Sequence, residues 1–298
     1  MLNMLKKSPI ARIVTLLILS QIIAGLILIP FFSLNIIKPD NYNIETIGIE
    51  LMTLILMLQA AANILLIYQL QTNYDGRPFH QLGFSREMLL KKLGLGSIIG
   101  IISILVIYLT LFFSNYIETS VNTLNLYSFT LYFGFFSIVA INEELLVRGY
   151  ILNNLLKSQQ KYVSIIISAL IFMLLHSGNN DVSLLSFVNL LLVGIFLGLY
   201  YAQYKDLWFP IGFHLTWNFM QGPVLGFPVS GLPIEGMLTQ KLAGSSTLTG
   251  GSFGLEGSYL VMTLLILLCA ILWSKGHKKN KKPQKHHRKI LNKQLIKR

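Results

Sequence analysis

Long apolar stretches separated by short polar segments constrain the fold of this chain more than any other feature. A transmembrane helix needs roughly 20 predominantly apolar residues, and the sequence contains eight candidate stretches. The 298 residues are 53% hydrophobic and only 12% charged, whereas soluble domains carry about 25% charged residues. The sequence therefore predicts an all-α, polytopic membrane helical bundle with about eight transmembrane helices, at about 12–33, 48–70, 92–114, 126–156, 163–177, 183–204, 207–220 and 257–274.

The net charge of +12 is concentrated at the C-terminus. Residues 275–298 hold eleven Lys and Arg and no acidic residue, which leaves +1 for the rest of the chain. Such a segment is typical of a cytoplasmic tail that rests near anionic lipid, so we expect no nucleic-acid partner. His277, His286 and His287 lie in this tail, where a solvated basic segment is favoured over a metal site.

The charges of the loops predict the orientation in the membrane. Basic segments alternate with acidic or weakly charged ones, and cytoplasmic loops carry the excess of Lys and Arg. We therefore expect a multi-pass protein of the cell membrane, in a bacterium the plasma membrane, with both termini in the cytoplasm and the first helix uncleaved. The expected segments are N-terminal helices at 1–125, a four-helix core at 126–220, a Gly-rich non-cytoplasmic loop at 221–256, a last helix at 257–274 and the tail at 275–298.

Three short motifs place polar residues inside otherwise apolar helices. They are Glu143-Glu144-x-x-x-Arg148, Phe172-x-x-x-His176 and His214-x-x-x-Asn218. Ionisable groups at membrane depth are costly and are by default candidates for a functional site. The motifs therefore indicate chemistry inside the membrane.

Helix geometry predicts that the first two motifs meet. No proline interrupts the fourth helix before Leu156, so we expect it to continue to a turn at about 158–160. Glu143 lies about 16 residues before this turn and His176 about 16 after it, which places both roughly 24 Å from it at 1.5 Å per residue. In an antiparallel hairpin they lie at the same height. His214 and Asn218 are four residues apart and share one helix face.

Each motif alone has a structural interpretation. Glu144 and Arg148 could be a buried ion pair, a lone His a satisfied core residue, Asn218 a contact between helices, and Phe172 packing. Together, at matching depths, they favour catalysis. A non-catalytic membrane scaffold and a transporter with a Glu and His proton relay remain as alternatives, although inverted repeats are not visible.

In their order and on these helices, the three motifs resemble the CPBP family of intramembrane proteases. This family includes the type II CAAX prenyl protease and bacterial Abi relatives linked to bacteriocin processing or immunity. The resemblance covers about 126–220, and 218–223 and 250–257 are similar to bacterial members. It implies an intramembrane endopeptidase, or an immunity protein that keeps the protease fold without turnover.

The chemistry of peptide hydrolysis assigns a role to each motif. A carboxylate and an imidazole can hold and deprotonate one water, a role for Glu143 and His176 that the resemblance also implies. We assign the oxyanion site to His214 and Asn218, and a supporting role to the pair Glu144 and Arg148. The expected substrate is a membrane-associated peptide or protein, such as a leader peptide, rather than a prenylated CAAX protein.

The need for a metal is the open question about this site. Family members are often labelled metalloproteases, and Glu143, His176 and His214 could provide an open zinc site. The chain has no His-Glu-x-x-His motif, and Asn218 suits hydrogen-bond donation better than zinc ligation. The favoured interpretation is that no cofactor is required, with zinc as the alternative.

Overall fold

A computed structural model describes residues 5, 8–37, 44–123 and 125–281. It confirms an all-α membrane fold with several spans. Within these residues, six helices are long and apolar enough to cross a membrane: Pro9–Ser33, Ile47–Tyr74, Leu89–Phe113, Leu126–Ser158, Leu184–Tyr204 and Tyr259–Gly276. The predicted fifth and seventh spans are shorter helices, α7 (Lys161–Leu175, 15 residues) and α9 (Trp208–Phe219, 12 residues). Among the described residues, six of the eight predicted spans therefore correspond to helices of membrane-spanning length.

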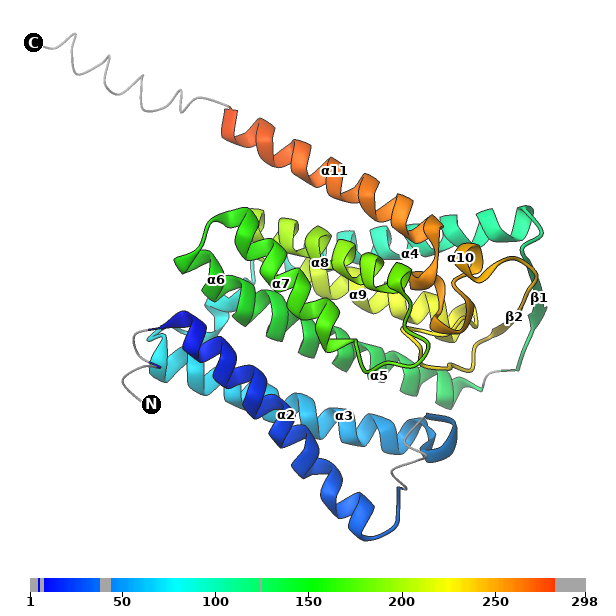
Figure 1. The fold of residues 1–298 in the computed structure, drawn as a ribbon, viewed down its shortest axis with the longest axis horizontal. Helices are drawn as coiled ribbons and strands as arrows, with labels where there is room; N and C mark the ends of the chain where they lie inside the picture. The colour runs from blue at the N-terminus through cyan, green and yellow to red at the C-terminus, as the bar shows by residue number, and fades with distance from the viewer. Residues whose placement is uncertain (1–4, 6–7, 38–43, 124, 282–298) are drawn as a thin grey trace, which may run out of the picture.

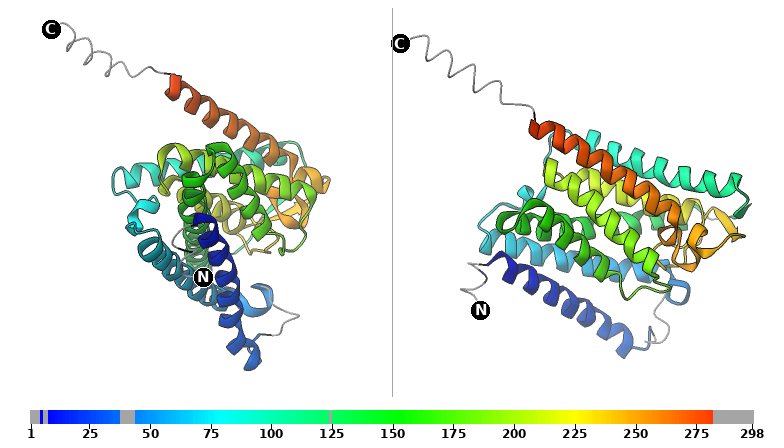
Figure 2. Two further views of the ribbon diagram at one scale, coloured as in Figure 1. Left: turned by 60° about the vertical axis from the view of Figure 1, so that its left-hand side comes forward. Right: turned by 45° about the horizontal axis from the view of Figure 1, so that its top comes forward.

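The helices form a bundle in which α5 (Leu126–Glu144) lies between two groups (Figures 1 and 2). The N-terminal helices lie on one side of α5, with α3 packed against it. On the other side, α9 contacts both α5 and α4. In the same group, α8 packs against α7 and against α11. The bounds are α2 (Pro9–Ser33), α3 (Ile44–Gln69), α4 (Leu89–Phe113), α8 (Leu184–Tyr204) and α11 (Tyr259–Lys281). Between α3 and α4 lie a π-helical segment, η2 (Leu70–Tyr74), and a 3-10 helix, η3 (Phe79–Leu82).

The fourth span continues past Glu144, as predicted. It runs from α5 into a π-helical segment, η4 (Leu145–Leu152), and ends in α6 (Asn153–Ser158). The chain turns at Gln159, and α7 begins at Lys161. The π-helical form of η4 was not predicted from the sequence, and π-helical turns often occur at functional sites.

Polar and small residues fix the position of α9. Asp206 caps its N-terminus by accepting hydrogen bonds from the backbone N–H groups of Trp208 (3.1 Å) and Phe209 (3.3 Å), and Lys92 Nζ lies 2.9 Å from the same carboxylate. On α4, a Cβ added at Gly96 would lie 2.1 Å from the carbonyl oxygen of Phe209. Glycine therefore permits close helix packing here, as is common between membrane helices.

A buried ion cluster joins the N-terminal helices to the central helix. The carboxylate of Asp75 lies 2.8 Å from Arg12 of α2 and 3.2 Å from Lys157 of α6. The hydroxyl of Tyr150 donates to the same carboxylate at 3.1 Å. One end of α2 is thus anchored against the core.

The segment expected to be a Gly-rich loop is more structured than predicted. Strand β2 (Leu238–Leu242) pairs antiparallel with β1 (Ile117–Val121), a small sheet that the sequence analysis missed. Such short strands carry little periodic signal. The remaining turns of this segment are η5 (Met220–Val224), α10 (Ser246–Thr249), η6 (Gly251–Phe253) and η7 (Leu255–Gly257).

At the C-terminus, α11 extends to Lys281, beyond the predicted end at 274. Most of the predicted basic tail, including His286 and His287, lies outside the described residues.

Candidate active site

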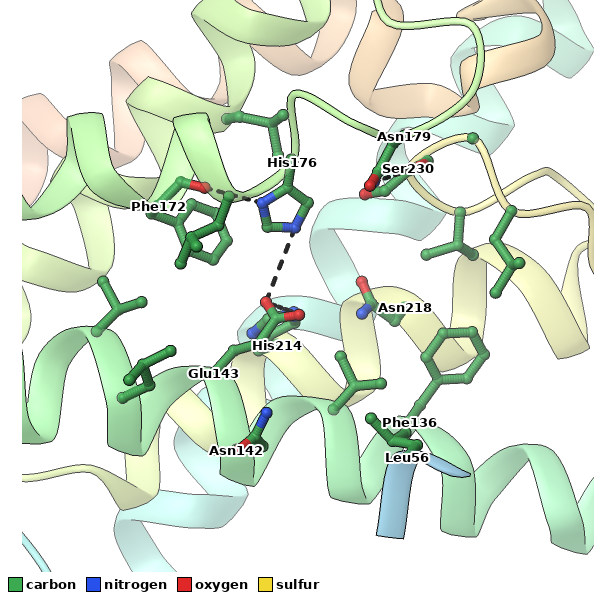
Figure 3. A pocket seen from close by; sticks show the side chains of 18 of the residues that line it. Leu56, Phe136, Asn142, Glu143, Phe172, His176, Asn179, His214, Asn218 and Ser230 are labelled. Carbon is green, nitrogen blue, oxygen red and sulfur yellow. Dashed lines mark hydrogen bonds and ion pairs between the residues drawn. The ribbon is translucent and has the colours of Figure 1, made fainter. Parts of the chain in front are cut away.

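Glu143, His176, His214 and Asn218 line one cavity of about 630 Å³. Glu143 is at the end of α5, His176 caps the C-terminus of α7, and the other two residues lie on α9. In Figure 3, the ring of His176 points toward Glu143, with Asn218 beside them. The fold therefore brings together the four residues that the sequence analysis selected as catalytic.

Both imidazoles direct Nε2 toward the same carboxylate oxygen. Glu143 Oε2 lies 3.8 Å from His176 Nε2 and 3.9 Å from His214 Nε2. These distances are too long for hydrogen bonds but short enough for one water to contact the carboxylate and an imidazole together. Among the described residues, Glu143 Oε2 has no hydrogen-bond partner.

The opposite ring nitrogens explain this orientation. Nδ1 of His176 lies 2.9 Å from the carbonyl oxygen of Phe172. A carbonyl oxygen only accepts, so Nδ1 carries the hydrogen. Nδ1 of His214 is 2.9 Å from Oε1 of Glu144 and donates to that carboxylate. When the rings are neutral, Nε2 of each is a lone-pair acceptor that faces Glu143.

Glu144 and Arg148 form the predicted pair behind the cavity. Nη1 of Arg148 lies 2.7 Å from Oε1 of Glu144, and both side chains are fully buried. The guanidinium also lies over the ring of Phe172, 4.4 Å from its centroid. Phe172 therefore does more than pack, since its carbonyl orients His176 and its ring covers Arg148.

The geometry does not fit a zinc site. Among the residues that the structure describes, no three His, Cys, Asp or Glu side chains are grouped so that they could hold one metal ion. Glu143, His176 and His214 are the closest in chemistry, but their facing atoms are 3.8 and 3.9 Å apart. Tetrahedral zinc with bonds of about 2.0–2.1 Å would separate adjacent ligand atoms by about 3.3 Å.

The cavity contains polar residues that the motifs did not reveal. Asn142, next to Glu143, accepts a hydrogen bond of 3.2 Å from Asn63 of α3. On another side of the cavity, Asn179 donates to the carbonyl oxygen of Ser230 at 2.8 Å, and both residues appear above Glu143 in Figure 3. For Asn63 the available signal was a single amide inside an apolar stretch.

One family model matches the part of the chain that contains these motifs. Residues 122–220 match the model described as "Rce1-like: Type II CAAX prenyl endopeptidase Rce1-like". No curated protein and no solved structure matches the chain. The matched segment includes each of the six predicted site residues, from Glu143 to Asn218.

Proposed function

The Rce1-like match supports assignment of this multi-pass membrane protein to the CPBP intramembrane proteases, and from that premise we propose that it is an endopeptidase whose nucleophile is a water activated by Glu143 and His176. The observation that carries this proposal is the convergence of two Nε2 atoms on Glu143 Oε2, at 3.8 and 3.9 Å. The substrate is a membrane-associated peptide or protein that reaches the cavity.

The proposed reaction begins with proton transfer from water. Glu143 takes the proton while His176 Nε2 accepts a hydrogen bond from the same water and orients it. The oxygen of the water attacks the carbonyl carbon of the scissile peptide bond and forms a tetrahedral intermediate. Glu143 then returns the proton to the leaving nitrogen as the C–N bond breaks.

The negative oxygen of the intermediate needs hydrogen-bond donors. Asn218 supplies its amide N–H₂ from the turn of α9 that follows His214. His214 already donates Nδ1–H to Glu144, so it donates from Nε2 only when the ring is protonated at both nitrogens. The oxyanion role of His214 therefore requires the imidazolium form, whose charge the neighbouring carboxylates compensate.

This mechanism uses no metal, because the spacing of the three candidate ligands supports water activation by protein groups alone. No step above depends on a cofactor.

We further propose that both termini face the cytoplasm and that the basic tail contacts anionic lipid. The support is the alternation of basic and acidic loops in the sequence. Reporter fusions at Asp40, which lies outside the described residues, and after Gly276 should report opposite sides of the membrane. The same side for both would show that the number of crossings between them is wrong.

The test of the enzymatic proposal compares matched substitutions in protein reconstituted into liposomes with candidate membrane peptides. Glu143→Ala and His176→Ala should abolish cleavage while the protein still inserts and accumulates. Glu118→Ala and His80→Ala are matched controls, because both residues are exposed and lie outside the cavity. A separate comparison uses the phenotype that the protein confers on its cell. If Glu143→Ala and His176→Ala leave that phenotype undiminished, the protein acts as a scaffold or immunity protein without turnover.

A further inference from the structure

A set of uncharged polar side chains from three neighbouring helices lines the cavity. Two of them lie on α2, two on α3 and one on α5, one residue before Glu143. We call this set the amide track; its members are Ser20, Gln21, Gln59, Asn63 and Asn142.

The track lies near the middle of two membrane-spanning helices. Ser20 and Gln21 are central in the span Pro9–Ser33, and Gln59 and Asn63 are central in Ile47–Tyr74. On α3, the cavity-lining residues Met52, Leu56, Gln59 and Asn63 recur at helical spacing on one face. Polar groups at this depth are unfavourable unless they find partners.

Two members of the track have a partner in each other, and the rest do not. Asn63 donates to Asn142 at 3.2 Å, which joins α3 to α5. Ser20 is 7% exposed, and its hydroxyl is buried without a hydrogen-bond partner among the described residues. Across the same residues, the structure gives no hydrogen bond to the amides of Gln21 and Gln59. Contact between helices accounts for the Asn pair but not for Ser20, Gln21 or Gln59.

We propose that the amide track binds the main chain of an extended segment of a membrane-embedded polypeptide and leads it to Glu143. A carboxamide offers both a donor and an acceptor, which is the pair that a peptide unit needs. A segment unwound from a helix in the membrane loses its internal hydrogen bonds at a cost of several kcal/mol per group. The amide track would form hydrogen bonds with the main-chain N–H and C=O groups that the segment exposes when it unwinds to present a peptide bond to Glu143.

The surroundings of the track fit the side chains of such a segment. Leu28, Met52 and Leu56 line the cavity beside the amides and provide apolar contacts. The outward face of α2 is apolar and suits contact with lipid, with Ile22 51% and Leu26 58% exposed. The inference deepens the proposed function, since it names the conformation and class of the substrate at the same site.

The experiment measures binding separately from hydrolysis. In a Glu143→Gln background, which is expected to be inactive, a short fluorescent peptide of alanine and leucine with blocked ends is titrated onto the purified protein in detergent. A second series of peptides replaces one main-chain N–H at a time with an ester oxygen, which removes a single donor. Gln59→Met removes the amide at nearly constant size, and Gln69→Met is the control on the same helix, outside the cavity.

Gln59→Met should weaken binding of the amide peptide about two- to tenfold, the range expected for one hydrogen bond. Gln69→Met should leave it unchanged. At one position of the peptide, the ester should weaken binding to the parent protein as much as Gln59→Met weakens binding of the amide peptide. When this ester peptide is bound to Gln59→Met, affinity should fall no further, because both changes remove the same hydrogen bond. Equal unfolding temperatures of the three proteins exclude a folding defect.

The inference is overturned if Gln59→Met and Gln69→Met change peptide binding equally. It is also overturned if every ester peptide binds like the amide peptide, or if the parent protein binds no peptide. None of these results bears on whether Glu143 catalyses hydrolysis, which the cleavage assay decides. Conversely, binding that depends on Gln59 in a protein without hydrolytic activity would reject the proposed function and retain the peptide site.

Discussion

Replacing Glu144 with leucine tests whether the buried ion pair orients the active site. Oε1 of Glu144 interacts with Arg148 at 2.7 Å and with His214 at 2.9 Å, and Glu144 and Arg148 are both fully buried. Glu144→Leu leaves the guanidinium buried without its counter-ion. Removing one partner of a buried pair typically costs about 3–5 kcal/mol, so we expect the free energy of unfolding to fall by about that amount.

A second substitution separates stability from orientation. Glu144→Leu with Arg148→Met removes both charges, and replacement of a buried ion pair by apolar residues is often neutral. The double variant should therefore recover most of the lost free energy of unfolding. His214 still lacks the acceptor for Nδ1–H, so the cleavage rate should stay about 10²-fold below wild type, as expected for a misplaced catalytic group.

The measurements are SDS-induced unfolding in mixed micelles and the liposome cleavage assay. Glu118→Leu is the matched control, because Glu118 pairs with Lys241 at 2.9 Å on the surface, with side chains 67% and 77% exposed. Such a pair contributes about 0–1 kcal/mol. Full activity in the stable double variant would refute the argument that Glu144 acts through His214.

Three further predictions concern the oxyanion site, the metal and pH. Asn218→Ala should lower the cleavage rate by about 10²–10³-fold, the usual loss for one oxyanion donor, with unchanged insertion; a loss as complete as that of Glu143→Ala would point to a different role. Purified wild type should carry no stoichiometric zinc, and chelators should slow it little; zinc that disappears in His214→Ala and restores a chelated sample would establish a metalloprotease. Burial raises the pKa of Glu256 above its ordinary value of 4.5, against the opposing hydrogen bond from Gln221. Between pH 4.5 and the raised pKa of Glu256, the folded state binds more protons than the unfolded state. The free energy of unfolding should therefore fall as the pH rises through this range. Glu256→Gln should flatten that pH dependence. If the unfolding temperature of Glu256→Gln depends on pH as that of wild type does, the prediction is wrong.

The membrane fold followed from the sequence because it depends on local properties. An apolar stretch of sufficient length forms a helix in lipid whatever surrounds it, since no other local structure satisfies its backbone. The same logic correctly predicted the continuation of the fourth helix past Glu144 to the turn at Gln159. It could not predict the short strands β1 and β2, whose pairing joins segments more than a hundred residues apart.

The candidate site was predictable where one helix or one hairpin sets the geometry. The pairing of Glu144 with Arg148 depends on a spacing of four residues, and the approach of Glu143 to His176 depends on equal distances from one turn. Only the tertiary structure decided that Glu144 also holds His214, because that contact depends on how α9 packs. It likewise decided that Gln59 and Asn63 face the cavity, since an apolar sequence around an amide does not specify which neighbour the amide will meet.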